Sequence, residues 1–501
     1  MKKSILFLAI ILLLISISSC NEDNLELKNP NSVATLVEDF PKNEAEFFAG
    51  INATYSPLQS QGLYGRWMHY VIDNMGLDNE ANAGIAADLN QFYAHNVSPD
   101  NPRIFQYWKN CYNGIFRANV LLDNIENINN IESLTDAEKN ARIGEIRYLR
   151  AFYYFLLTSR FGDIPLYTSG DNGIEGFPKS SREDVYQLII SDLTEASNVL
   201  LTKDATEPGR VTKGAANALL GKVQLYRQDY AAAKAAFDQV ITGGQHSLVA
   251  NYFDNFTGET ELNSESVFEV LFIFAGGSYG WNEADDTGFI ESSVLAAEYG
   301  FKGFHNVNPA NDLVAEYEIG DIRKDENFYF PGDTYGANGD LIVTQGDIGA
   351  ETATWRKYML TYKQDTDLTF FNFSDINWRV IRYSDVLLMA AEAENELGNQ
   401  AGAVSLMNQV RTRVNMPLYG TVAMDATYPV TSKEEVFAAI VHERRVELAG
   451  EMIRFPDLVR WGLADDVLPD FKVGISEVLP IPQGEIDTNI NLTNADQNTG
   501  Y

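Results

Sequence analysis

NWRVIRYSDVLLMAAEAENELGNQAGAVSLMNQVRTRVN is the segment from Asn377 to Asn415. On either side of a break at 397–399, apolar residues recur three and four positions apart, a spacing typical of amphipathic helices. Small residues such as Ala391 and Ala403 lie where two such helices would have to approach each other. The segment therefore predicts an antiparallel helical hairpin.

An earlier segment, residues 216–241, has the same form: ANALLGKVQLYRQDYAAAKAAFDQVI. Aligning Gly221 with Ala391 places Phe237 on Met407. The order of small and large residues matches that of a tetratricopeptide unit. We therefore predict an all-α fold of stacked tetratricopeptide-like hairpins, an α-α superhelix, in which residues 377–415 form a second copy. Such stacked scaffolds present extended binding surfaces, so we expect a binding protein.

Composition narrows the class further. The chain has 501 residues, of which 45% are hydrophobic, enough to bury a large core. Its formal net charge of -33 repels phosphate groups and argues against nucleic-acid binding. Because the acidic residues form no long run, we expect them to be spread over a solvated surface. Their distribution does not indicate a particular partner. Cys111 lies in a helical pattern and is expected to be buried.

The N-terminus predicts export. Two lysines precede an apolar run, Ile5 to Ile15, that is too short for a comfortable membrane span. Ile17-Ser18-Ser19-Cys20 then resembles the lipobox of bacterial lipoproteins, and the acidic residues after it resemble a surface-export signal of Bacteroidetes. We predict a signal peptide at 1–19, lipidation of Cys20 by acyl chains such as palmitate, a polar tether at 20–31 and a folded domain at 32–501. An ordinary signal peptide with a coincidental cysteine is the alternative.

Helical patterns also cover 43–59, 104–128, 135–160, 181–201 and 432–450, and Thr135 with Glu138 predicts a capping box. Two regions, 61–102 and 243–377, are instead rich in Gly, Asn, Asp and aromatic residues. We expect both to be loop-rich, with a few short strands such as one within 266–275. Surface loops of this kind commonly carry function.

Motifs of catalysis are incomplete. Gly276 to Gly280 matches the G-x-S-x-G elbow around Ser278, but a polar loop follows where a helix is required. His442 begins an H-E-x-x-H pattern whose second histidine is replaced by Val446. We therefore expect no catalytic residue, no metal and no cofactor. A surface hydrolase of glycans or esters, using Ser278 or a carboxylate pair, is the alternative.

Sugars bind proteins by stacking on aromatic rings while amide and charged side chains bond their hydroxyls. Two stretches, within 64–93 and 279–286, have this composition outside the helical patterns. The candidate ligand-binding residues are Arg66, Trp67, Tyr70, Asn74, Tyr279, Trp281 and Asn282. Because Trp67 and Tyr70 are three residues apart, the alternative is that they are core residues of a short helix. Trp108, Trp378 and Trp461 are expected in the core.

Several segments together resemble the SusD/RagB family of outer-membrane nutrient-binding lipoproteins. They are RYLRAFYYFLLTSRFGDIPL (147–166), VIRYSDVLLMAAEAENELG (380–398), VHERRVELAGEMIRFPDLVRWG (441–462) and LPIPQGEIDTNINLT (479–493). The pattern departs at 451–456, where a Gly after Glu451 and an aromatic residue in place of Pro456 would be usual. Within the third segment, Glu443, Arg444, Arg445 and Glu447 are spaced for pairing along one helix.

The resemblance implies a protein anchored in the outer membrane by its lipid and facing the cell exterior. It would bind an oligosaccharide and deliver it to a SusC-like TonB-dependent transporter. A family member that binds peptides is an alternative. On this view the hairpins are a platform turned to the transporter, and the loops that they carry hold the ligand.

Overall fold

The computed structural model describes residues 40–82, 84–170, 176–273, 291–349, 351–364 and 373–501. The longer helices are α3 (Glu44–Tyr55), α6 (Pro102–Asp123), α8 (Asp136–Phe161), α9 (Arg182–Val199), α10 (Lys213–Tyr226), α11 (Tyr230–Thr242), α16 (Tyr383–Glu396), α17 (Gln400–Arg413) and α19 (Lys433–Glu447). The shorter ones are α4 (Met68–Ile72), α5 (Ala87–Tyr93), α7 (Ile125–Asn129), α12 (Leu295–Tyr299), α13 (Asn311–Glu316), α14 (Ile322–Asn327), α15 (Gln345–Ile348), α18 (Val422–Asp425), α20 (Arg454–Trp461), α21 (Ala464–Val467) and α22 (Gln483–Thr488). Single 3-10 turns are η2 (Ser56–Gln59), η3 (Lys203–Ala205), η4 (Tyr252–Phe256), η5 (Leu360–Lys363) and η6 (Asn494–Asp496).

Both predicted hairpins are confirmed, as α10 with α11 and α16 with α17. The α16–α17 connection turns at Gly398, whose φ of 85° is a left-handed conformation that glycine adopts without strain. Asn399 then accepts a hydrogen bond from the Gly402 amide and caps α17. In the first hairpin, a Cβ on Gly221 would lie 2.4 Å from the Phe237 ring. Glycine at 221 therefore lets α10 and α11 approach closely.

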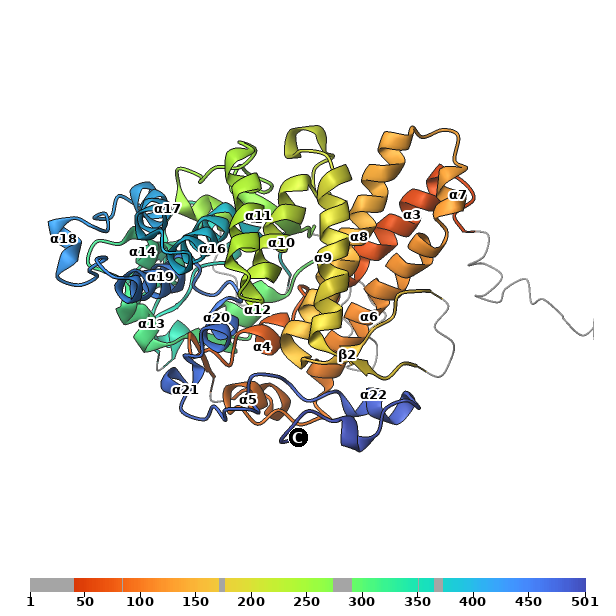
Figure 1. The fold of residues 1–501 in the computed structure, drawn as a ribbon. Helices are drawn as coiled ribbons and strands as arrows, with labels where there is room; N and C mark the ends of the chain where they lie inside the picture. Colours follow the sequence, from red (N-terminus) through yellow and green to blue (C-terminus); the bar gives the residue numbers. More distant parts are fainter. Residues whose placement is uncertain (1–39, 83, 171–175, 274–290, 350, 365–372) are drawn as a thin grey trace, which may run out of the picture.

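The hairpins stack into the predicted superhelix. Helix α8 packs on α9, α9 on α10, α11 on α16 and α16 on α19, which Figure 1 shows as a row from orange to blue. The capping box of Thr135 and Glu138 is confirmed at the start of α8. The helix predicted at 104–128 is divided in two, since α6 ends at Asp123 and α7 begins at Ile125.

A loop-rich layer is built from the regions predicted as loops together with the segments around α20 to α22. Its helices α4, α5, α20, α21 and α22 lie below the row of long helices in Figure 1. Its strands form antiparallel pairs: β1 (Asn79–Ala81) with β5 (Val307–Pro309), β2 (Ile164–Pro165) with β3 (Lys179–Ser180), β4 (Ser266–Val270) with β10 (Trp378–Arg382), β6 (Phe328–Tyr329) with β9 (Thr354–Trp355), and β7 (Thr334–Tyr335) with β8 (Leu341–Ile342). The β1–β5 pair joins the two loop-rich regions, and β4 confirms the strand predicted within 266–275.

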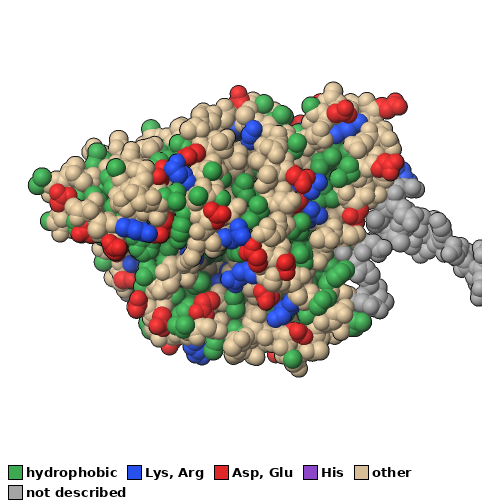
Figure 2. Space-filling model, in the orientation of Figure 1, with side chains coloured by type: hydrophobic (Ala, Val, Ile, Leu, Met, Phe, Trp, Pro, Cys, Tyr) green, Lys and Arg blue, Asp and Glu red, His purple; other side chains and the backbone are tan. Residues whose placement is uncertain are grey.

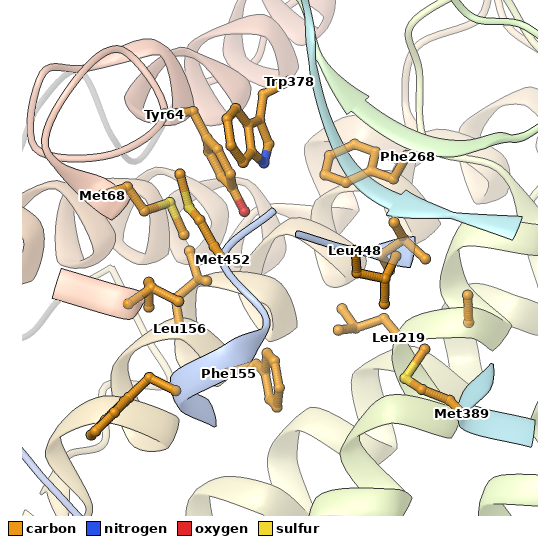
Figure 3. Close-up of a cluster of buried hydrophobic side chains, with 14 of the residues drawn as sticks. Tyr64, Met68, Phe155, Leu156, Leu219, Phe268, Trp378, Met389, Leu448 and Met452 are labelled. Atoms are coloured by element: carbon orange, nitrogen blue, oxygen red, sulfur yellow. The ribbon is translucent and has the colours of Figure 1, made fainter. Parts of the chain in front are cut away.

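A mixed aromatic and methionine core fills the seam between the two layers (Figure 3). Tyr64, Trp378 and Met452 from the loop-rich layer face Phe155 and Leu219 from the superhelix. They surround part of a small cavity of about 60 Å³. The predicted burial of Cys111, Trp108 and Trp378 is confirmed. Trp461 is only half-buried, because it lies edge-on against Phe437 at the surface of α19.

The charged residues of α19 pair with other elements, so the prediction that they pair along their own helix is wrong. Glu443 accepts a 2.6 Å hydrogen bond from Arg323, and Glu447 accepts bonds from Arg323, Arg382 and Arg413. All five side chains are almost fully buried. We call this group the α19 ion cluster. Arg444 and Arg445 likewise bond to Asp385, Asp457, Asp78 and Asp312.

Candidate functional site

Three loop segments of the lower layer are joined at one place. The Val294 amide donates to the Gly65 carbonyl at 2.9 Å, which joins the turn before α4 to the segment before α12. The Ile273 amide donates to the Glu291 carbonyl at 2.6 Å. Ser293 and Ser374 exchange two backbone hydrogen bonds of 2.9 and 2.7 Å. We call this place the loop junction, and Ile273 and Glu291, the two residues that flank 274–290, both belong to it.

The loop junction brings the two predicted ligand-binding stretches together at their bases. Gly65 directly precedes Arg66 and Trp67, and Ile273 and Glu291 flank the segment that contains Tyr279, Trp281 and Asn282. Those last three residues, and Ser278, lie outside the described residues. Their assignment as ligand-binding residues stays a prediction, as does the lipidation of Cys20, which also lies outside them.

Arg66 and Trp67 are buried, contrary to the expectation of ligand-facing side chains. The Trp67 ring lies between two guanidinium groups, that of Arg66 at 3.8 Å and that of Arg103 at 4.1 Å from the ring centroid. Arg66 also pairs with the fully buried carboxylate of Glu298 at 2.6 Å, and Arg103 pairs with Asp88 at 2.8 Å. This cation–π stack connects α4 to α5, α6 and α12. Its role here is to hold the loops in place.

Tyr70 and Asn74 are buried as well, so the alternative that the Trp67–Tyr70 pair belongs to the core is the correct one. Tyr70 donates to Glu298 at 3.0 Å, and burial together with that carboxylate raises the pKa of Tyr70 well above its usual range. Asn74 donates to the Tyr93 hydroxyl and accepts from Asn79, the first residue of β1. The spacing of three residues alone could not show that this face of α4 turns inward.

Acid and base groups near the loop junction are held in neutral or paired states. Burial lowers the pKa of His69 to about 3, with Arg66 as a second cause. Burial also raises the pKa of Asp73 to about 7, helped by the nearby Asp78, while the Phe455 amide donates to Asp73 at 2.9 Å. Both groups are closed off from solvent, so neither is an exposed acid or base.

His442 has structural partners. It shares a 2.5 Å contact with Glu316 and lies 2.8 Å from the Tyr428 hydroxyl. Although burial works in the opposite direction, the hydrogen bonds to Glu316 and Glu318 raise the pKa of His442. The described ranges contain no group of three or more His, Cys, Asp and Glu side chains arranged to hold a metal ion.

Half-buried polar and aromatic side chains that the sequence reasoning missed lie around Arg66. Phe304 lies with its ring centroid 4.9 Å from the Arg66 guanidinium, and Asn306 donates to Glu298 at 3.0 Å. Asn82 donates to the His305 carbonyl across the two loop-rich regions. More than 200 residues separate Arg66 from Phe304 and Asn82 from His305, so no local sequence pattern could show these contacts.

The fold and the loop junction define a class: a helical-repeat scaffold that carries a loop-rich layer. The chain belongs to the SusD/RagB family. Residues 246–474 match the profile described as "SusD family", and residues 24–225 match the one described as "Starch-binding associating with outer membrane".

Individual relatives agree with this. SusD-like protein P25 of Formosa agariphila is 26% identical and covers 98% of both chains. A SusD superfamily protein from Bacteroides vulgatus has a TM-score of 0.78 at 25% identity, over 92% of this chain and 100% of its own. A solved structure described as a laminarin binding SusD-like protein has a TM-score of 0.73 at 28% identity, over 92% of this chain and 100% of its own.

Within the described residues, no helix is long and apolar enough to cross a bilayer.

Proposed function

We propose that this chain is a cell-surface lipoprotein that binds oligosaccharides and delivers them to a SusC-like TonB-dependent transporter. The observation that carries the proposal is the loop junction, where backbone hydrogen bonds join Val294 to Gly65, Ile273 to Glu291 and Ser293 to Ser374 beside a helical scaffold. The relative described as laminarin-binding, which has the same fold over its whole length, supports a carbohydrate as the ligand class. The chain acts as a binding protein without a catalytic step.

The lipid anchor and the helical scaffold have different roles in this proposal. Acyl chains on Cys20 hold the protein at the outer membrane, on its exterior face, and the polar tether lets it reach the transporter. Tethering keeps the local concentration of bound glycan high at the transporter without a tight contact. In this proposal the superhelix of stacked hairpins is the surface turned to the transporter.

Within the loops, Trp281 is the aromatic residue that we propose to stack on the sugar, with Tyr279 and Asn282 beside it. Arg66, Trp67, Tyr70 and Asn74 are buried and support the loops from within. Arg66 and Trp67 lie one and two residues after the turn that receives the Val294 amide, and the stack with Arg103 fixes that turn against α6. Preorganised loops lose less entropy when a ligand binds.

Binding of the full-length chain, purified in mild detergent, to a panel of glycans and peptides tests the proposal. We expect binding to at least one glycan, loss of about tenfold or more in affinity for Trp281→Ala, and no change for the matched control Trp461→Ala. Binding to peptides alone would overturn the ligand class. Turnover of a glycan or an ester that Ser278→Ala abolishes would show a hydrolase instead.

The anchor needs a separate measurement. Cys20→Ala should release the protein from the membrane fraction and abolish labelling by palmitate in cells, whereas the buried thiol of Cys111 should be unlabelled in both forms. Equal labelling of the wild type and of Cys20→Ala would overturn the lipoprotein assignment.

A further inference from the structure

A row of aromatic rings lies on the molecule away from the loop junction. Tyr112 of α6 contacts Tyr167, with ring centroids 5.4 Å apart, and Tyr167 contacts Phe177, with centroids 5.0 Å apart. Both contacts are edge-to-face, at 87° and 84°. Trp108 continues the row inward from Tyr112 at 5.0 Å. We call Tyr112, Tyr167 and Phe177 the aromatic ladder.

The ladder reaches the surface. Phe177 is 39% exposed, and Tyr112 and Tyr167 are half-buried. Phe105, which is 40% exposed, lies in the same region. Its ring packs against Gly484 of α22, at the place that a Cβ on that glycine would occupy. Figure 2 shows hydrophobic side chains on the lower right of the face drawn, where Figure 1 places β2 and α22.

Several hydrogen bonds fix the positions of these three aromatic residues. The Tyr112 hydroxyl donates to the Pro165 carbonyl at 2.7 Å. The backbone of Tyr167 is bonded on both sides by the Tyr154 hydroxyl, which accepts from its amide at 2.8 Å and donates to its carbonyl at 2.6 Å. Asn489, next to α22, donates to the Phe177 carbonyl at 2.9 Å. Rings fixed in this way lose little freedom when a ligand stacks on them.

The surroundings of the ladder select a neutral ligand. Glu485 of α22 accepts from the Trp108 indole at 3.1 Å and from Asn489 at 2.9 Å, so a carboxylate lies at the base of the row. Burial and this carboxylate raise the pKa of Tyr167 to about 12, which keeps its hydroxyl protonated. An anionic ligand would be repelled here. Aromatic faces with neutral hydroxyl and amide groups suit the CH faces and hydroxyls of a sugar chain.

We propose that the aromatic ladder is a second carbohydrate-binding surface, which holds a distal part of a long neutral glycan whose other part is bound at the loop junction. This inference rests on the proposed function. Helix α6 links the two places: Gly62, in the turn of the loop junction, packs so closely on α6 that a Cβ there would lie 2.8 Å from Gln106 and Asn110. Tyr112 lies two residues beyond Asn110 on the same helix, about 200° around its axis, so a long glycan that reaches both places passes around α6.

Two linked sites predict a dependence on glycan length. A chain long enough to reach both sites gains affinity because its second contact is intramolecular, whereas a short oligosaccharide gains nothing. Removal of the Phe177 ring should therefore weaken the binding of long chains and leave that of short ones unchanged. Phe116 of α6 offers a matched control. Its exposed fraction of 40% is close to the 39% of Phe177, and among the described residues it makes no ring contact with the ladder.

The experiment compares wild type, Phe177→Ala and Phe116→Ala as full-length chains in mild detergent, with a neutral glycan as polymer and as short oligosaccharide. We expect Phe177→Ala to bind the polymer about tenfold more weakly, with wild-type affinity for the oligosaccharide, and Phe116→Ala to match the wild type on both. Phe105→Ala should repeat the Phe177→Ala pattern more weakly.

The outcomes separate the two proposals. Unchanged polymer affinity for Phe177→Ala would overturn the ladder while leaving the loop junction intact. Equal losses on polymer and oligosaccharide would also overturn it, because the ring would then belong to a single site. If Phe177→Ala instead lost only the co-purification of a transporter, the ladder would be a protein contact. Absence of glycan binding by the wild type would overturn the proposed function itself.

Discussion

The superhelix and the loop-rich layer both have well-buried side chains, but each region is stabilised by a different kind of contact. Helices α10, α11, α16 and α17 pack through repeated small and apolar residues, such as Gly221 against Phe237. The loop-rich layer is held by single polar contacts between residues far apart in sequence, such as Arg66 with Glu298 and the Trp355 indole with Asn79 at 3.1 Å. Repetition spreads stability over many contacts, whereas the loop layer depends on a few.

The α19 ion cluster, which connects α17 and α19 of the superhelix to α14 and β10 of the loop-rich layer, is the largest group of such polar contacts and should produce the largest effect. Glu447→Ala would remove a buried carboxylate that pairs with Arg323, Arg382 and Arg413, and would leave Glu265 as the carboxylate that Arg382 and Arg413 still share. We expect a loss of about 3–5 kcal/mol in the free energy of unfolding, because three buried guanidinium groups lose part of their charge compensation. Denaturant unfolding followed by circular dichroism measures it.

The matched control is Glu396→Ala, which removes the carboxylate of the exposed Lys433–Glu396 pair and should cost less than about 0.5 kcal/mol. If both variants lost the same small amount, the loop layer would not depend on the cluster, and the contrast between the two regions would fail.

Trp67 gives the next largest effect and tests whether burial or ligand contact explains this residue. Trp67→Ala removes the ring between Arg66 and Arg103, and we expect it to cost about 3 kcal/mol of stability. Glycan affinity, measured at a temperature where the variant remains folded, should change by about twofold or less. An unchanged melting temperature together with a tenfold loss of affinity would return Trp67 to the set of ligand-binding residues.

These two cases mark how far the sequence alone could lead. The hairpins, the turn at Gly398 and the capping box of Thr135 were predictable, because each depends on residues close together in the chain. The partners of Glu447 were not, since Arg323, Arg382 and Arg413 come from three other elements and the helical spacing offered a nearer partner.

The candidate site, too, was predictable in part. Its composition located the two stretches, and the hydrogen bond from Val294 to Gly65 shows that their bases meet. Composition could not tell which face of α4 turns inward, so Tyr70 and Asn74 were assigned to the ligand although they support β1 and α12. The aromatic ladder could not be predicted from the sequence, because Tyr112 and Phe177 are 65 positions apart and lie on segments without a shared pattern.

Asp73 is expected to make the stability of the loop layer depend on pH. Its folded pKa of about 7 lies above that of an unfolded aspartate, so the folded state binds this proton more tightly. The wild type should therefore lose stability from this group as pH rises from about 4 through about 7. Asp73→Asn keeps an oxygen for the Phe455 amide and should gain about 2 kcal/mol relative to wild type at pH 8, with little difference at pH 4. Unfolding curves at the two pH values measure this, and a difference that is the same at both would contradict it.

Gly221 tests the other side of the comparison and should give the smallest effect. Alanine normally stabilises a helix relative to glycine by about 1 kcal/mol, but here its Cβ would lie 2.4 Å from the Phe237 ring. We expect Gly221→Ala to cost about 1 kcal/mol net, because the overpacking outweighs the gain in helix propensity. In a Phe237→Leu background the same substitution should be neutral or stabilising, since the smaller side chain leaves room for the methyl group. Chemical unfolding of the four variants gives this coupling directly. Equal effects in both backgrounds would mean that the hairpin tolerates the contact by small shifts, and that its repeated packing is even less dependent on single residues than the loop layer.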